Sequence, residues 1–294
     1  MVSVILPTYN CENTVERTIR SVLNQSYGDL ELIVVDDGSK DNTVNVIESI
    51  CDDRIRLIKN AINKGACVVR NIGIDEARGE YIAFQDGDDI WVDDKLEKCL
   101  NTMEQQECDV VFSSYIVNDK KIIPPCNVNT AENKLLFHMQ YFCVGTPTIV
   151  GKREVFIAEK FDEKLPRLQD YELMIRVFMK YNVFFIDEPL VKAYVQKGGI
   201  TSNPEKGITA VSYIIDKYNS LLEDNKGIKA ILYELLGKLY EDNRLDGHDY
   251  FKIAYYSQKE LRRYVLFILS KMRMYNCIHD FVASLKHTKI SYER

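Results

Sequence analysis

The chain has 294 residues, of which 46% are hydrophobic and 28% are charged, and its formal net charge at pH 7 is −6. This length and composition suit one large globular domain with an appendage, or two domains. Proteins that bind nucleic acids usually carry a basic surface, so the acidic balance of this chain argues against a nucleic-acid partner.

Predicted strands and helices alternate through the first half of the chain at a spacing of roughly 25 residues. Short apolar runs bounded by polar residues or glycine predict buried strands, and the stretches between them predict helices. This alternation is typical of β-α-β units, so we expect a mostly parallel sheet with helices on both faces. The strands are expected at Val2–Leu6, Leu30–Val35, Ile55–Ile58 and Tyr81–Gln85, and the helices at residues 13–23, 41–50, 63–77 and 93–106.

The second half of the chain is less regular. Its strands are expected at residues 110–117, 146–150, 183–186 and 190–195, and its helices at residues 132–140 and 170–180. Gly198 and Gly199 are typical of a mobile connection, and from about residue 206 the pattern is almost wholly helical. We therefore expect an α/β domain over residues 1–205 and a helical region over residues 206–294.

Polar clusters follow three of the predicted strands, at the carboxyl ends where open α/β sheets bind ligands. The third cluster, Asp86-Gly87-Asp88-Asp89, holds three carboxylates within four positions. Gly87 lets the backbone bend, so that Asp86 and Asp88 can point to one place. Carboxylates this close repel one another, and a hard divalent cation with oxygen ligands is their natural counter-charge. Alone, Asp-Gly-Asp is also typical of a solvated turn before a helix, but its position after a buried strand favours the cation site.

Two common nucleotide-binding signatures are absent from the sequence. No G-x-G-x-x-G follows the first predicted strand, which argues against a dinucleotide site, and there is no Walker A sequence. A sheet of this kind therefore needs another counter-charge for phosphate, and a metal ion held by acidic residues supplies one.

The eight cysteines of the chain occur singly. None forms a C-x-x-C pair, so zinc binding is not expected. Met1 leads directly into an apolar strand rather than into a secretory leader, so a disulfide framework is not expected either. We expect a cytoplasmic protein with reduced thiols.

Four segments of the first half together resemble the family 2 glycosyltransferases of the GT-A fold. The order and spacing of the family's motifs are matched by Val2–Asn10, Glu31–Thr43, Asn63–Gly73 and Tyr81–Trp91. The resemblance covers roughly residues 2–195, and it departs from the family at Val69, where alanine is usual. It implies a GT-A fold, which is a Rossmann-like α/β fold with a mostly parallel sheet flanked by helices. In addition to this fold, we expect the helical C-terminal extension.

The resemblance implies a site for the nucleotide of a sugar donor, with uracil as the expected base. Asp37 is implied to accept a hydrogen bond from the uracil imide, whose N3–H is a donor. Pro7, Thr8 and Tyr9 are implied to line the base pocket. The alternative interpretation of Asp36–Ser39 is a turn that caps the following helix.

Four further residues are implied to contact the ribose, the diphosphate or a metal ion. Arg70 and Asn71, on the third predicted helix, are expected to reach the ribose or the diphosphate, Arg70 by a charge-assisted contact. Asp86 and Asp88 are implied to flank the ribose and to hold Mn²⁺ or Mg²⁺ on the diphosphate. Taken alone, Arg70 is more typical of a surface ion-pair residue.

Transfer to a hydroxyl group also requires a base, because a sugar hydroxyl must lose its proton as the new bond forms. The family places an acid before an aromatic residue at the start of a late helix, and the matching residues here are Asp170 and Tyr171. The resemblance therefore implies Asp170 as the general base, with Glu172 as its rival. Asp170 is also suited to a helix N-cap, and the two roles are compatible.

Two aromatic residues are candidates for the acceptor side of the site. Trp91 is the only tryptophan, and sugars stack on aromatic faces; Tyr171 directly follows Asp170. A position in the hydrophobic core is an equally good interpretation of Trp91.

The last part of the chain is basic and partly apolar. Residues 261–294 contain seven lysines and arginines against two acids, with aromatic residues and methionines between them. This composition is typical of a segment that lies on an anionic membrane. The alternative, packing against the main domain or against a second subunit in a homodimer, is slightly favoured.

These observations and the resemblance predict an inverting glycosyltransferase with a nucleotide-sugar donor and a saccharide or lipid-linked saccharide acceptor. By resemblance, its setting is bacterial surface-polysaccharide assembly at the cytoplasmic face of the membrane. A nucleotidyltransferase is an alternative, although the glycine- and lysine-rich phosphate loop usual in that class is absent. A catalytically silent nucleotide-sugar-binding module is the other alternative, and it applies if Asp170 is misplaced.

Overall fold

The computed structural model describes residues 1–117, 121–124, 127–194 and 203–275. The chain divides into two compact units. The sheet unit consists of Met1–Lys164 and Gln169–Lys197, and the helical unit consists of Leu165–Leu168 and Gly198–Arg294. The sequence patterns place the division at residue 205. The connection expected to be mobile, Gly198-Gly199, lies outside the described residues.

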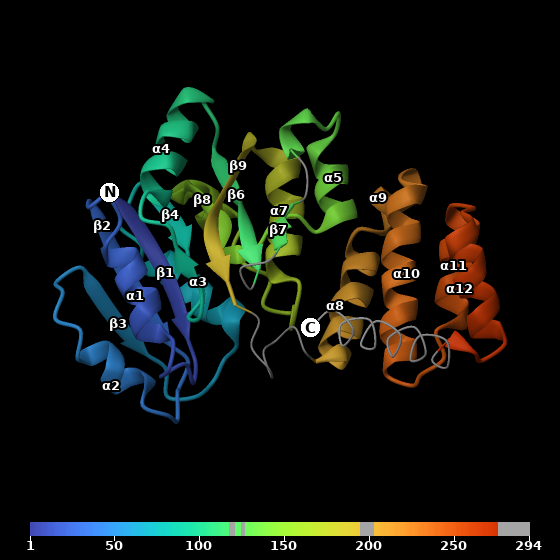
Figure 1. Cartoon of the computed structure of the whole chain (residues 1–294), viewed down its shortest axis with the longest axis horizontal. Helices are drawn as coiled ribbons and strands as arrows, with labels where there is room; N and C mark the ends of the chain where they lie inside the picture. Colours follow the sequence, from blue (N-terminus) through green and yellow to red (C-terminus); the bar gives the residue numbers. More distant parts are fainter. Residues whose placement is uncertain (118–120, 125–126, 195–202, 276–294) are drawn as a thin grey trace, which may run out of the picture. The chain divides into compact units, whose positions relative to one another are not determined.

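The strands of the sheet unit are β1 (Val2–Thr8), β2 (Leu30–Asp36), β3 (Ile55–Lys59), β4 (Tyr81–Phe84), β5 (Ile90–Trp91), β6 (Val110–Val117), β7 (Lys121–Ile123), β8 (Ile149–Lys152) and β9 (Val183–Ala193). Within the described residues they form one sheet in the order β3-β2-β1-β4-β8-β6-β9-β5, with β7 paired to β6 (Figure 1). β1 is parallel to β2 and β4, and β2 is parallel to β3. β8 is antiparallel to both β4 and β6, so β6 and its parallel neighbour β9 run in the direction of β1. The sheet is therefore mostly parallel, as predicted.

The helices of the sheet unit are α1 (Val15–Leu23), α2 (Thr43–Glu48), α3 (Ala66–Glu76), α4 (Lys95–Gln105), α5 (Lys134–Tyr141), α6 (Arg153–Ala158) and α7 (Gln169–Lys180), with the 3₁₀ helices η1 (Val128–Thr130) and η2 (Thr146–Thr148). Successive residues of a strand point to opposite faces. In β1, Ile5 belongs to one hydrophobic cluster, and Val4 and Leu6 belong to another. Residues of α3, α6 and α7 complete the first cluster, and residues of α1, α2 and α4 complete the second. Helices thus cover both faces of the sheet, as the apolar strands predict.

Two stretches differ from the sequence prediction. The strand expected at residues 146–150 begins as η2, because Pro147 has no N–H to pair in a sheet and the Thr148 hydroxyl donates to the Gly145 carbonyl at 2.7 Å. The strands expected at residues 183–186 and 190–195 are one strand, β9, whose register with β6 shifts on both sides of Ser114. This irregularity accounts for the break in the apolar pattern within β9.

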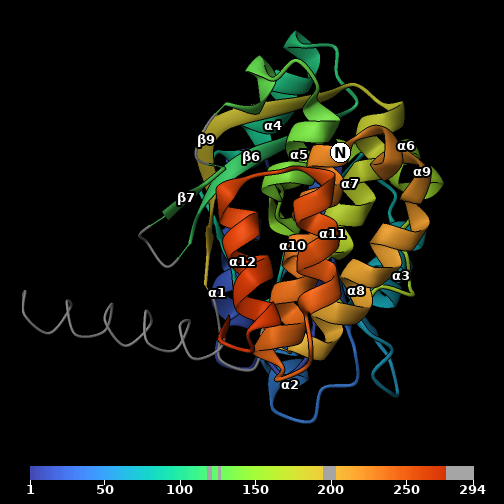
Figure 2. The ribbon, with the colours of Figure 1, turned by 90° about the vertical axis from the view of Figure 1, so that its right-hand side faces the viewer.

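The helices of the helical unit are α8 (Pro204–Lys217), α9 (Asn219–Asp224), α10 (Lys226–Asp242), α11 (His248–Ser257) and α12 (Leu261–Lys271). α10 packs against α8 and α11, and α12 packs against α11 (Figure 2). The helical pattern expected after residue 206 is confirmed for the described residues. None of the helices in the described part of the chain is both long and apolar enough to span a bilayer.

Candidate active site

Three strand ends meet at one edge of the sheet. β1 is parallel to both β2 and β4, and its register pairs Thr8 with Asp36. The polar segments that follow these strands therefore leave the sheet on the same side. The Asp-Gly-Asp turn after β4 lies against the segment after β1, because a Cβ on Gly87 would be 3.2 Å from Cys11 Sγ. The Thr14 hydroxyl also donates to the Gly87 carbonyl at 2.7 Å.

Asp36, the last residue of β2 and the first of two neighbouring acids, is a structural residue. Its Oδ2 accepts hydrogen bonds from the backbone N–H groups of Gly38 and Ser39 at 3.1 and 3.0 Å. Gly38 has a φ of +75°, which glycine adopts without steric strain. The N-cap of α2 is Asn42, so this turn does not cap the helix as the alternative interpretation had it.

Asp37 connects β2 to the start of α3. Its carboxylate accepts hydrogen bonds from the backbone N–H groups of Lys64 and Gly65 at 2.9 and 2.8 Å, and from Asn60 Nδ2 at 3.2 Å. A carboxylate has about four lone-pair sites, so these bonds leave room for one further donor. Asp37 is thus held by three hydrogen bonds and has one acceptor position left.

Arg70 lies at the centre of the site and links three elements. From α3, its Nη2 donates to Asp86 Oδ1 and its Nη1 donates to Gln169 Oε1, both at 2.6 Å. The guanidinium also lies over the Phe161 ring, 5.3 Å from its centroid. Arg70 is only 6% exposed, so it is not a surface ion-pair residue. The contact with Gln169 was not predicted, and the only signal for it is that Gln169 directly precedes Asp170.

Asp170 lies in the first turn of α7, as predicted, and is held through both oxygens. Oδ2 accepts from the backbone N–H of Thr146 at 3.1 Å, and Oδ1 accepts from the N–H of Tyr171 at 2.8 Å. Burial raises the pKa of Asp170; the Tyr171 N–H and the charge of Arg70 oppose this, and the charge of Asp86 adds to it. Because Asp170 interacts with both Arg70 and Asp86, it belongs to the same site as the acids after β4. No local pattern pointed to Thr146.

The acids after β4 carry more negative charge than their surroundings compensate. Burial, with the charge of Asp86 in addition, raises the pKa of Asp88 to about 6. Burial, with the charges of Asp86 and Asp88, raises the pKa of Asp89 to about 8. Asp89 supports the site by accepting from the N–H of Tyr194 at 3.0 Å. Arg17 partly offsets these charges, and its Nη2 donates to the Asp88 carbonyl at 3.0 Å.

The donor set of this acidic cluster fits a hard divalent cation. Carboxylate oxygens are the ligands that Mg²⁺ and Mn²⁺ prefer, and the pKa values of Asp88 and Asp89 are raised by burial and, in addition, by the charges of the neighbouring acids. In the described residues, no group of three or more His, Cys, Asp or Glu side chains is placed to hold a metal ion. Mg²⁺ is commonly bound by one or two carboxylates together with substrate phosphates and water. Asp86 and Asp88 suit that kind of site.

Asn71, a predicted donor contact, and Glu172, the rival base, both bind other groups of the protein. Asn71 Nδ2 donates to the Phe161 carbonyl and to Glu163 Oε1, both at 3.0 Å, and Asn71 Oδ1 accepts from the Phe161 N–H at 2.9 Å. Both ends of the Asn71 amide are thus engaged within the protein, and its contact with the donor stays a prediction. Glu172, the rival base, is 0% exposed and paired with Arg176 at 2.9 Å.

The structure places both acceptor-side candidates in the core. Trp91 is 2% exposed, and its Nε1 donates to the Pro147 carbonyl at 3.2 Å. Tyr171 is also 2% exposed, and its hydroxyl donates to the Met139 carbonyl at 2.9 Å. Neither ring presents a face on which a sugar can stack, so the core interpretation of Trp91 is preferred and the acceptor-side prediction for both is corrected.

The residues predicted to line a base pocket differ in exposure. Tyr9 is 48% exposed, and Pro7 is half-buried. Thr8 is 2% exposed, and its hydroxyl donates to Asp36 Oδ1 at 3.2 Å. Tyr9 is thus available to a ligand, whereas Thr8 supports the turn beside it.

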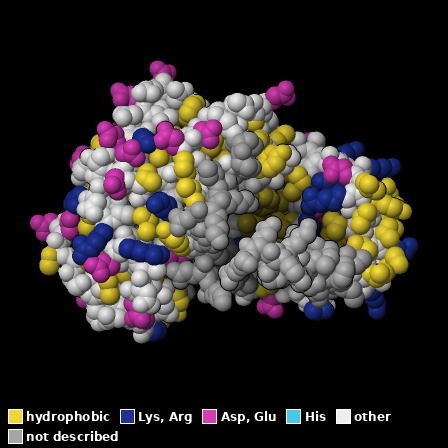
Figure 3. All heavy atoms as spheres, in the orientation of Figure 1, with side chains coloured by type: hydrophobic (Ala, Val, Ile, Leu, Met, Phe, Trp, Pro, Cys, Tyr) yellow, Lys and Arg dark blue, Asp and Glu magenta, His cyan; other side chains and the backbone are white. Residues whose placement is uncertain are grey.

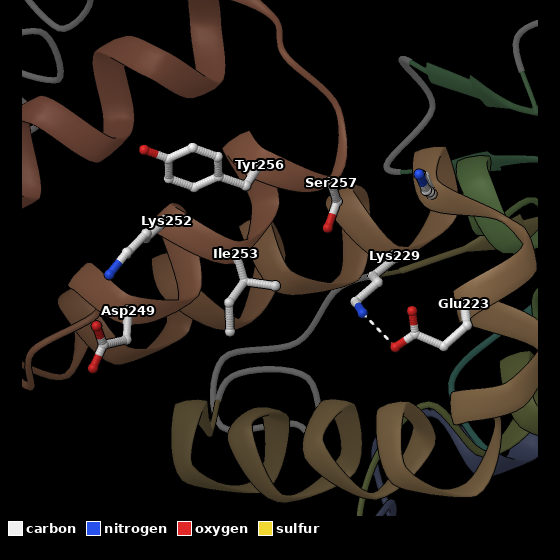
Figure 4. A pocket seen from close by; sticks show the side chains of 8 residues that line it. Glu223, Lys229, Asp249, Lys252, Ile253, Tyr256 and Ser257 are labelled. Carbon is white, nitrogen blue, oxygen red and sulfur yellow. Dashed lines mark hydrogen bonds and ion pairs between the residues drawn. The ribbon is translucent and has the colours of Figure 1, made fainter.

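The helical unit contains a separate pocket of about 570 Å³. It lies between α9, α10 and α11 and is lined by the Glu223–Lys229 ion pair and by Asp249, Lys252 and Tyr256 (Figure 4). All its lining residues belong to the helical unit, and its lysines are largely offset by acids. It does not contain the strand-end acids.

Comparison with known proteins identifies relatives of the chain. Residues 3–151 match the family model described as glycosyl transferase family 2. The Escherichia coli protein UDP-Glc:alpha-D-GlcNAc-diphosphoundecaprenol beta-1,3-glucosyltransferase WfgD is 33% identical over 213 residues, covering 70% of this chain and 81% of WfgD.

Two solved structures are similar in fold. S. aureus TarS 1–349 in complex with UDP-GlcNAc has a TM-score of 0.63 at 16% identity, covering 93% of this chain and 92% of the TarS chain. The mannosyltransferase PcManGT from Pyrobaculum calidifontis, in complex with GDP-Man and Mn²⁺, has a TM-score of 0.61 at 17% identity, covering 96% of this chain and 83% of that chain. The predicted GT-A fold is confirmed.

Proposed function

The chain belongs to glycosyl transferase family 2, and we propose that it is an inverting enzyme that transfers a sugar from a nucleoside diphosphate sugar to a hydroxyl group of a saccharide acceptor. One observation carries the proposal. Arg70 binds Asp86 and Gln169 at the same time, so the candidate metal-binding acids and the candidate base Asp170 share one site. Displacement of a diphosphate by a hydroxyl group requires a base that takes the hydroxyl proton. It also requires positive charge, held here by acidic side chains, that stabilises the leaving diphosphate.

The donor is proposed to be a UDP-sugar whose uracil lies at the ends of β1 and β2. Asp37 has one free acceptor position for the imide N–H, and its bonds to the backbone N–H groups of Lys64 and Gly65, just before α3, fix it in place. The exposed ring of Tyr9 is a stacking surface for the base. The names of WfgD and of the TarS complex, which include UDP-Glc and UDP-GlcNAc, support this class of donor.

Asp86 and Asp88 are proposed to hold Mg²⁺ or Mn²⁺ together with the donor diphosphate. The burial of Asp88 and Asp89 and the repulsion between these acids and Asp86 support this assignment, as does the presence of Mn²⁺ in the PcManGT complex. When bound, the ion supplies positive charge that stabilises the departing nucleoside diphosphate. Arg70 positions Asp86 for this task through its 2.6 Å hydrogen bond.

Asp170 is proposed to be the general base. Its carboxylate takes the proton of the acceptor hydroxyl while the acceptor oxygen bonds to the anomeric carbon. Attack from the face opposite the leaving diphosphate inverts the configuration at that carbon. The raised pKa of Asp170 makes it a stronger base than an exposed aspartate, and Thr146 and Tyr171 fix its orientation.

The acceptor is proposed to be a lipid-linked saccharide used in bacterial surface-polysaccharide synthesis. The diphosphoundecaprenol in the name of WfgD supports this class of acceptor. An acceptor of this kind is anchored in the membrane, so the enzyme is proposed to be a cytoplasmic protein that works at the inner membrane surface.

The test of the proposal is donor turnover by the wild type and by Asp170→Asn. We expect the wild type to release a nucleoside diphosphate in the presence of acceptor. Asp170→Asn is expected to lose this activity by a factor of about 10²–10⁴ while still binding the donor. Release of pyrophosphate would instead indicate a nucleotidyltransferase, and release of neither product would indicate a silent binding module. Full activity of Asp170→Asn would refute the base assignment.

A further inference from the structure

The helix α12 buries two polar residues and exposes several apolar ones. Its polar residues Arg263 and Ser270 are buried, at 6% and 4% exposure. Arg263 Nε lies 3.3 Å from Glu234 Oε2 on α10, and Ser270 Oγ lies 3.2 Å from His248 Nδ1 on α11. The side of α12 that packs within the helical unit is therefore attached partly by polar contacts.

An apolar stripe runs along α12 and is exposed. Leu261, Val265, Ile268 and Met272 are spaced by four, three and four residues, which places them on one face of a helix. Leu261 is 79% exposed, Val265 46% and Met272 59%, and Tyr264 beside them is 44% exposed. A surface helix normally buries such a stripe, so this face is suited to an apolar partner.

Basic side chains border this stripe. Arg262 is 69% exposed although it pairs with Glu234, and Lys271 and Arg273 are exposed at the other end of the helix. Figure 3 shows hydrophobic side chains of the helical unit gathered beside Lys and Arg side chains. An apolar stripe with a basic border is typical of helices that lie in the interface of a bilayer with anionic lipids.

We propose that the stripe of Leu261, Val265, Ile268 and Met272, with Tyr264 beside it and its basic border, forms a membrane-docking face that lies on a bilayer containing anionic lipids. The apolar side chains enter the headgroup region, and Arg262, Lys271 and Arg273 meet the anionic headgroups. A second copy of the chain fits the face less well, because its basic residues would approach an identical set. The purpose of this docking face is access to a lipid-linked acceptor, and in this respect the inference rests on the proposed function.

The test is cosedimentation of the full chain with vesicles. We expect the wild type to sediment with vesicles of phosphatidylcholine and phosphatidylglycerol, less with phosphatidylcholine alone, and less at high salt. The double variant Leu261→Ser/Val265→Ser is expected to bind at least about tenfold more weakly, because it removes apolar area from the interface. Lys271→Gln/Arg273→Gln is expected to weaken binding and to reduce its dependence on salt.

The matched control is Ile62→Ser, which removes a side chain that is 68% exposed on the sheet unit and is expected to leave vesicle binding unchanged. Failure of the wild type to bind anionic vesicles overturns the proposal, as does equal binding by the wild type and Leu261→Ser/Val265→Ser. A wild-type dimer in light scattering that this variant lacks, without vesicle binding, would assign the face to a second copy instead. Nucleoside diphosphate release with a water-soluble acceptor, measured without vesicles, tests the proposed function separately.

Discussion

Arg70 Nη2 lies 2.6 Å from Asp86 Oδ1, and the other terminal nitrogen of the same guanidinium binds Gln169. One buried cation thus holds both the first acid after β4 and the residue before the candidate base. A guanidinium can serve two acceptors in fixed directions, whereas an ammonium group is a single point charge. The separation of Asp86 and Asp170 is therefore set by α3, which carries Arg70.

Replacement of Arg70 tests this link. Arg70→Ala leaves Asp86 without its cation, and breaking a buried pair in this way costs about 3–5 kcal/mol. We expect the lower end of that range, because the Asp86 side chain is 29% exposed. Urea denaturation measures the loss, and donor turnover is expected to fall with it. Arg20→Ala, which breaks an exposed pair with Glu16, is the control and is expected to cost about 0.5 kcal/mol. Equal losses for the two variants would contradict the buried link.

The acids after β4 should make the stability of the metal-free protein depend on pH. Asp88 has a pKa raised to about 6, so the folded chain binds its proton more tightly than the unfolded chain does. Ionisation of Asp88 therefore destabilises the fold above that pH. Asp88→Asn is expected to raise the Tm relative to the wild type at about pH 8, with a difference that shrinks below about pH 6 and vanishes near about pH 4. Asp53→Asn, at an exposed acid, is the control in the same thermal melts.

Binding of a metal ion should remove the destabilisation that ionised Asp88 causes. With UDP present to supply phosphate ligands, Mn²⁺ is expected to raise the Tm of the wild type more at about pH 8 than at about pH 5, because protons compete for the carboxylates. Asp88→Asn is expected to lose most of this shift. If the variant keeps the full Mn²⁺ shift, Asp88 is not a ligand.

Trp91 should act on catalysis from a distance. Its Nε1 holds the Pro147 carbonyl, and the neighbouring Thr146 N–H holds Asp170. Trp91→Phe removes the first of these bonds, so Asp170 is expected to lose part of its orientation. We expect kcat to fall by about tenfold with little change in the KM for the donor, and the pH profile of kcat to shift upward.

Thr146→Val is the comparison for Trp91→Phe. It removes only the Thr146 hydroxyl, which lies 3.4 Å from Asp170 Oδ2, and keeps the backbone N–H at 3.1 Å. Thr146→Val is therefore expected to lower kcat less than Trp91→Phe does. An unchanged pH profile in Trp91→Phe, with only a loss of stability, would show that Trp91 serves the core alone.

Replacement of Lys95 should stabilise the sheet unit. Lys95 is 0% exposed, its Nζ has no hydrogen-bond partner within the described residues, and burial lowers its pKa to about 8. Lys95→Met keeps the length of the side chain and removes the buried amine. The ammonium lies 4.0 Å from the centroid of the Trp91 ring, a contact worth up to about 2 kcal/mol that methionine partly replaces.

We expect a net gain for Lys95→Met of about 1–2 kcal/mol at about pH 7, because burial of a charge costs more than this contact returns. The lowered pKa means that the folded chain binds this proton less tightly than the unfolded chain. The gain should therefore fall as the pH rises from about 8 to about 10.5 and disappear above it. Denaturation at three pH values checks the trend, and a gain that grows with pH would contradict the explanation.

The sequence predicted those parts of the site that follow from strand order. The carboxyl ends of parallel strands meet at one edge, so Asp37 and the acids after β4 were found from the alternation of strands and helices. The start of α7 was found from the resemblance and from its amphipathic pattern. Contacts such as Arg70 with Gln169 join segments distant in sequence and have no local signal.

Side-chain burial was the part that the sequence did not determine. Asn71 and Trp91 were predicted as site residues because their chemistry suits a sugar or a phosphate. Their actual partners, Phe161, Glu163 and Pro147, come from segments whose packing no local pattern describes. The same limit applies to β8, whose antiparallel position was not expected from the alternating pattern.

The insertion of β8 between β4 and β6 has a consequence for synthesis of the protein on the ribosome. A nascent chain that ends before Ile149 contains β4 and β6 but not the strand that separates them. Until β8 emerges, the edge that each of these strands presents to β8 has unpaired backbone N–H and C=O groups, which are open to pairing with other chains. Aggregation during translation should therefore be greatest for nascent chains whose emerged part ends between residues 117 and 149.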